Sequence, residues 1–128
     1  MNIHEEQLIL NFLDPNKKER FLELLGNPKR RDEFLKSLGH FHDLDKRWRL
    51  EISGAARQSG NILELLDAKG APKKCWVISE SSKLDGRTMV LGDALDEAVC
   101  SDMGTFISCL PGKLAYLDNE DGGWLLQR

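Results

Sequence analysis

The segment Thr105–Gln127, TFISCLPGKLAYLDNEDGGWLLQ, decides the fold of this 128-residue chain. It contains three runs rich in aromatic, aliphatic and β-branched residues, and turn-forming residues separate them, which is typical of strands. The predicted strands are Thr105–Leu110, Leu114–Asp118 and Trp124–Gln127. Pro111 and Gly112 stand where a type II turn requires them, so we expect a tight hairpin there. Asn119–Gly123 predicts a looser hairpin loop. The segment is therefore predicted to be an antiparallel meander.

Upstream of this meander, the sequence predicts a strand, a helix and a second strand. Polar and apolar residues alternate in Arg47–Ile52, which indicates a half-buried strand. Its apolar members, expected to face the core, are Trp48, Leu50 and Ile52. Asn61 and Glu64 have the spacing of a capping box at the start of a helix. The continuous apolar run Cys75–Ile78 then predicts a central strand that is covered on both faces. This order favours a βαβ unit with parallel strands.

The first 40 residues predict short helices, because apolar residues recur there at helical spacing between Pro- and Gly-containing breaks. Helices of this length are marginal alone and must pack on another element. We therefore expect a single α+β domain over residues 1–128, helical over 1–40 and sheet-containing over 46–128. Its short N-terminal helices would pack on a mixed sheet that contains one βαβ unit and the C-terminal antiparallel meander.

The composition and charge narrow the class of protein. With 41% hydrophobic and 30% charged residues, the chain is globular in composition. Residues 91–128 carry seven acidic residues against only Lys113 and Arg128, a net charge of −5. This acidic third would repel phosphate, so we expect no nucleic-acid partner, and it would attract a basic protein surface. The N-terminus resembles no signal peptide and no apolar stretch could span a membrane, which favours a cytoplasmic protein without a membrane partner.

The sequence contains no clear cofactor or metal motif. Cys75, Cys100 and Cys109 are too widely spaced for a zinc knuckle or a redox dithiol, so we expect reduced thiols. No Gly-rich phosphate-binding loop is present. The histidine cluster around His40 and His42 lacks the Asp and the third His that a metallo-hydrolase pattern requires, because Leu44 and Asp45 occupy those positions. We therefore predict no metal site and no cofactor. The sequence does not determine whether the cluster formed by His40, His42 and Asp45 is functional.

Two hypotheses about function follow. The first is a small protein-binding module, such as an immunity protein or antitoxin that covers a basic partner. Its contact residues would be exposed acidic side chains at a loop tip, namely Asp118, Glu120 and Asp121. The alternative is a small-molecule-binding or enzymatic domain with a pocket at the carboxyl ends of the parallel strands. The side chains expected to line that pocket are Arg57, Glu80, Asp85 and Arg87. Because no catalytic motif is found, the first hypothesis is favoured, and no catalytic residue is predicted.

Overall fold

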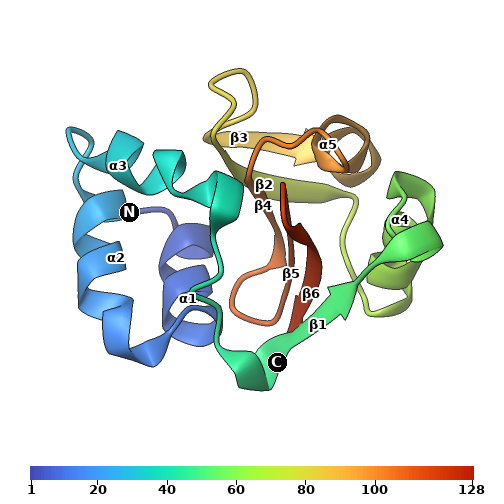
Figure 1. Ribbon diagram of the computed structural model, residues 1–128, viewed down its shortest axis with the longest axis horizontal. Helices are drawn as coiled ribbons and strands as arrows, with labels where there is room; N and C mark the ends of the chain where they lie inside the picture. Colours follow the sequence, from blue (N-terminus) through green and yellow to red (C-terminus); the bar gives the residue numbers. More distant parts are fainter.

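A computed structural model describes residues 1–128 and shows a six-stranded sheet with helices on both faces (Figure 1). The helices are α1 (Ile3–Phe12), α2 (Lys18–Gly26), α3 (Arg31–Lys36), α4 (Ser59–Ala68) and α5 (Leu91–Ala98). The strands are β1 (Arg49–Ile52), β2 (Lys74–Ser79), β3 (Arg87–Val90), β4 (Thr105–Leu110), β5 (Leu114–Asn119) and β6 (Gly122–Gln127). Their order in the sheet is β1-β6-β5-β4-β2-β3, and all neighbours are antiparallel. None of the helices combines the length and apolar character needed to cross a membrane.

The C-terminal meander is confirmed and forms the middle of the sheet. The Lys113 amide donates to the Leu110 carbonyl over 3.0 Å, and Gly112 has φ +71°, as the predicted turn requires. The second hairpin is tighter than expected, because β6 begins at Gly122, which pairs with Asn119. Nearly every residue of β4, β5 and β6 is buried, since helices cover both faces of these strands.

The two faces of the sheet carry separate hydrophobic layers. Helices α1, α2 and α3 cover the face that presents Phe106 and Leu117, and α4 and α5 cover the face that presents Ile107 and Tyr116. The first layer contains edge-to-face aromatic contacts at centroid distances of 5.6–5.7 Å. Their members are Phe21, Phe34, Phe41 and Phe106. The predicted N-terminal helices therefore gain their stability from this packing.

The predicted βαβ unit is wrong, and so are the mixed sheet and its parallel strands. Strands β1 and β2 are not neighbours, because β6, β5 and β4 lie between them. Strand β2 instead pairs antiparallel with β3 and β4. The order strand, helix, strand along the chain does not determine how many other strands lie between the two strands in the sheet. Here the more apolar meander fills the centre, and α4 carries the chain across its face.

The strand predicted over Arg47–Ile52 is shorter and less buried than expected. Residues Lys46–Trp48 form a 3₁₀ turn, which begins where the Asp45 carboxylate accepts a hydrogen bond from the Arg47 amide. Ile52 is buried, as predicted, but Leu50 is 61% exposed. The reason is position in the fold, since β1 is an edge strand. The alternation of polar and apolar residues identified the strand, but it could not show that the strand lies at the edge of the sheet, where the helices cover it incompletely.

Candidate functional site

Most of the residues singled out from the sequence lie at one end of the sheet. Strand pairing brings the end of β2, the start of β4, the β5–β6 turn and the end of β1 together there, through the pairs Ser79–Thr105, Thr105–Asp118 and Ile52–Gly123. Four carboxylates at this end have no arginine or lysine partner, namely Glu80, Asp102, Glu120 and Asp121. We call this set the acidic end.

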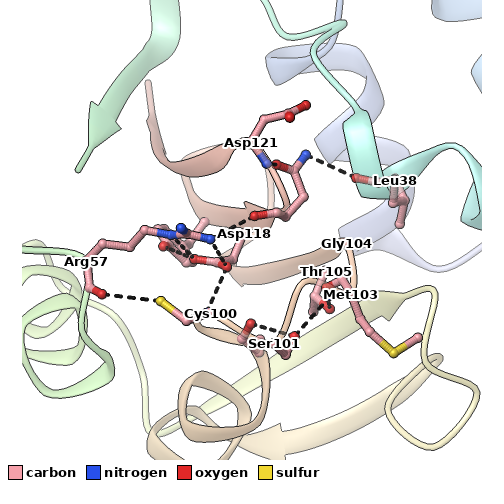
Figure 2. Close-up of polar contacts among 12 residues, drawn as sticks. Leu38, Arg57, Cys100, Ser101, Met103, Gly104, Thr105, Asp118 and Asp121 are labelled. Atoms are coloured by element: carbon pink, nitrogen blue, oxygen red, sulfur yellow. Dashed lines mark hydrogen bonds and ion pairs between the residues drawn. The ribbon is translucent and has the colours of Figure 1, made fainter. Parts of the chain in front are cut away.

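Asp118 lies beneath the acidic end and is fully buried, so the expectation that it is exposed is wrong. The Arg57 guanidinium donates to its carboxylate over 2.8 Å (Figure 2). It also donates to the Asn119 carbonyl over 2.7 Å. The Tyr116 hydroxyl donates to the other Asp118 oxygen over 2.5 Å, and the Cys100 amide completes the shell at 3.1 Å. These contacts satisfy a buried charge and fasten the segment before α4 to the sheet.

The same network changes the proton affinities of its members. Burial, followed by the hydrogen bond to Asp118, raises the pKa of the Tyr116 hydroxyl above its ordinary value. The hydrogen bond to Asp118 raises the pKa of the Arg57 guanidinium. Both groups therefore keep their protons at neutral pH. They act as fixed hydrogen-bond donors to Asp118.

Asp85 and Arg87, the other two members of the expected pocket besides Arg57 and Glu80, hold the loop between β2 and β3 in place. The Arg31 guanidinium donates to Asp85 over 2.9 Å, and Asp85 also accepts from the Ser79 amide over 3.0 Å. Arg31 extends the pairing to the buried Glu5 at 2.8 Å. Arg87 lies on the edge strand β3 and donates to the Lys83 carbonyl. Arg57 and Arg87 therefore do not converge with Glu80 on one pocket.

Glu80 is the member of that set that faces open space. Its carboxylate accepts from the Gly104 amide over 2.7 Å, and it lines a hollow of about 580 Å³. The other lining residues are Lys36, Ser37, Gly39, His40, Asp102, Met103 and Glu120. Three carboxylates against Lys36 and His40 make this a polar, negatively charged hollow. Asp85 and Glu80 also share a smaller hollow beside it.

His40 joins the helical layer to the acidic end. Its Nε2 lies 2.6 Å from the Glu120 carboxylate, and its Nδ1 lies 3.2 Å from the Asp121 carboxylate. The hydrogen bond to Asp121, together with the charge of Glu120, raises the pKa of His40. In the sequence, His40 stands near His42 and Asp45, and the predicted cluster contained only these three residues. No local signal could have joined His40 to Asp121, which follows 81 residues later.

The rest of the histidine cluster is dispersed. The Asp45 carboxylate is buried and paired with Arg47 at 2.7 Å, and the hydrogen bonds from Arg47 hold the pKa of Asp45 below its usual value. His42 is exposed and belongs to no ion pair. The chain holds no grouping of three or more His, Cys, Asp or Glu side chains arranged to bind a metal ion.

Residues 100–104 form a tight loop next to the hollow. Cys100 and Asp102 have φ +59° and +65°, a left-handed conformation that few non-glycine residues adopt. A Cβ on Gly104 would lie 2.3 Å from the Leu38 backbone, so only glycine fits where this loop meets the helical layer. The loop thereby places Asp102 and Met103 on the rim of the hollow. Comparison with known protein families, with curated proteins and with solved structures found no match to this chain.

Proposed function

We propose that this chain is a protein-binding module that covers a basic surface of its partner with the acidic end, in the manner of an immunity protein or an antitoxin. One contrast supports the proposal. The buried carboxylates Glu5, Asp45 and Asp118 are each paired with an arginine of the same chain. The carboxylates that line the hollow, Glu80, Asp102 and Glu120, have no arginine or lysine partner, and Glu120 contacts only His40, so they are available to lysine or arginine side chains of another protein.

The geometry of the hollow suits the insertion of a long basic side chain. Glu80 lines the hollow and accepts a hydrogen bond from the Gly104 amide, and Asp102 and Glu120 are exposed lining residues. A guanidinium or ammonium group that enters would meet carboxylates from three separate segments of the chain. Clustered charge of one sign also accelerates encounter with an oppositely charged surface. The loss of Asp118 from the predicted contact set moves the interface toward Glu80, Asp102, Glu120 and Asp121.

The alternative, a small-molecule-binding or enzymatic domain, has less support. It placed a pocket at the carboxyl ends of the parallel strands, and every strand pairing of the sheet is antiparallel. Two of its four residues, Arg57 and Asp85, are already held in ion pairs with Asp118 and Arg31.

The experiment is affinity capture from an extract of the cells that make the protein. The wild-type chain is compared with the double variant Glu120→Lys, Asp121→Lys and with a matched control, Glu19→Lys, Glu23→Lys, which makes the same charge change on the exposed surface of α2. We expect a basic protein that the wild type and the control retain and that the acidic-end variant loses.

The captured protein then tests the immunity or antitoxin role. Expressed alone, it should slow cell growth, and co-expression of the wild-type chain, but not of the acidic-end variant, should restore growth. If the basic proteins captured by the acidic-end variant and by the control are the same, the acidic end is not the interface. If the captured protein is harmless, the chain binds a basic partner without being an immunity protein or antitoxin.

A further inference from the structure

The outer edge of β1 is an unpaired strand edge that presents an apolar side chain. Strand β1 stands first in the sheet order, so no strand of this chain pairs with its outer side. Leu50, at its centre, is the most exposed large hydrophobic side chain of the protein at 61%. Unpaired backbone amides and carbonyls along such an edge are a template for pairing with another strand.

The residues on either side of Leu50 carry opposite charges that the chain does not use. Arg49 and Glu51 take part in none of the ion pairs of the structure. Their register with Leu126 and Trp124 places both on the face of the sheet that α1, α2 and α3 cover, whereas Leu50 projects from the other face. The edge therefore presents a basic, an apolar and an acidic residue in succession.

We propose that two copies of this chain pair through β1 in antiparallel direction, about a two-fold axis at Leu50. In this register Arg49 of each copy lies opposite Glu51 of the other, and the two Leu50 side chains lie opposite each other. Directly opposed residues of antiparallel strands have Cβ atoms about 4.5–5.5 Å apart, so both ion pairs and the leucine contact can form. The result is a continuous sheet that runs through both copies.

The charges select this register over its neighbours. A two-fold axis in an antiparallel sheet that passes through a residue brings that residue against its own copy. An axis at Arg49 would oppose two arginines, and an axis at Glu51 would oppose two glutamates, which is unfavourable. The other edge of the sheet, β3, contains no acidic residue to oppose Arg87. Strand β1 is therefore the edge that is complementary to itself.

The contact between the two β1 strands is small, so we expect the dimer to be weak. Strand β1 has four residues, so the pairing buries less than the roughly 1,200 Å² at which stable interfaces begin. We expect a reversible dimer with a dissociation constant on the order of 100 µM. The inference does not depend on the proposed function, because none of the residues of β1 belongs to the acidic end.

The first test is sedimentation equilibrium of the full chain between about 10 µM and 1 mM. We expect Arg49→Glu and Glu51→Arg each to weaken dimerisation about tenfold, since each opposes like charges. The double variant Arg49→Glu, Glu51→Arg restores both ion pairs and should return to within about twofold of the wild type. A wild-type chain that stays monomeric throughout, or a double variant no tighter than the single variants, would overturn the proposal.

The second test fixes the register by a disulfide. Leu50→Cys is combined with Cys100→Ser, which removes the one exposed natural thiol. Val90→Cys in the same background is the matched control, because Val90 is 49% exposed on the other edge strand. Oxidised glutathione should link the Leu50→Cys variant into a covalent dimer while the control stays monomeric. Circular dichroism verifies that both variants are folded. Equal linkage of the two variants would show random collision and would contradict the two-fold axis at Leu50.

Discussion

The guanidinium of Arg57 and the fully buried carboxylate of Asp118, which are 61 residues apart in the sequence, form an ion pair with a shortest distance of 2.8 Å. This pair links the segment between β1 and α4 to the central strand β5. Asp118 also accepts hydrogen bonds from Tyr116 and Cys100, but Arg57 is the only cation that compensates its buried negative charge.

Removal of Arg57 should therefore destabilise the protein strongly. Arg57→Ala leaves a buried carboxylate without its cation, and we expect the free energy of unfolding to fall by about 3–5 kcal/mol. Urea denaturation followed by circular dichroism measures the change. Arg87→Ala is the control, because Arg87 is exposed and contacts only a carbonyl, and it should cost less than about 0.5 kcal/mol. A loss below about 1 kcal/mol for Arg57→Ala would show that water reaches Asp118.

Two glycines offer a matched pair of substitutions. Gly104→Ala places a Cβ 2.3 Å from the Leu38 backbone, which cannot move aside as a flexible side chain can. We expect the free energy of unfolding to fall by about 2 kcal/mol or more. Gly60→Ala lies near the start of α4 with open space around it, and we expect a gain of about 0.5–1 kcal/mol from helix propensity. Thermal denaturation of both variants measures the difference, and equal melting temperatures would contradict the close packing at Gly104.

The parts of the fold that local sequence determines could be predicted. The turn at Pro111–Gly112 and the short N-terminal helices depend on residues within a few positions of one another, and the structure contains them. The partners of β1 and β2 could not be predicted, because a helix between two strands is compatible with neighbouring strands or with a crossover that spans several. Strand order is a property of the whole chain.

The candidate site was predicted in outline and not in detail. The acidic C-terminal third drew attention to Glu120 and Asp121, but it did not separate the buried Asp118 from the exposed Glu120. One local signal was available, because Asp118 lies two residues after Tyr116 and so projects from the same buried face of β5. The contributions of Arg57, Gly104 and His40 depend on long-range contacts, which no spacing in the sequence indicates.

The three thiols should differ in reactivity. Burial raises the pKa of Cys75 to about 11 and that of Cys109 to about 12, so neither forms a thiolate at neutral pH. Cys100 is exposed. Titration of the folded protein with a thiol reagent at pH 7 should therefore modify Cys100 alone, and mass spectrometry of the digest identifies the site. Addition of denaturant should release the other two thiols. Rapid modification of Cys75 in the folded protein would show that β2 opens toward solvent.

The contacts of His40 with Glu120 and Asp121 should make both stability and partner binding depend on pH. The pKa of His40 is raised in the folded state by Asp121 and Glu120, so protonated His40 stabilises the fold. This contribution is complete below the ordinary pKa of about 6.5 and is lost as the pH rises through the higher folded-state value. A two-dimensional NMR titration of the imidazole resonances should give His40 a pKa above the ordinary histidine value of about 6.5. The variant Asp121→Asn should lower the pKa of His40.

The affinity for the partner should depend on pH in the opposite direction to the stability. Below the folded-state pKa, the His40 cation neutralises part of the charge of Glu120 and Asp121, which a basic partner would otherwise use. Affinity for the captured partner should therefore rise between pH 6 and pH 8, a range bracketing the ordinary histidine pKa of about 6.5. His40→Gln should bind with an affinity that no longer changes over this range, whereas the control His42→Gln should keep the wild-type dependence. Calorimetric titration at both pH values measures the effect. An unchanged pH dependence in His40→Gln would show that the contacts of His40 with Glu120 and Asp121 do not affect the interface.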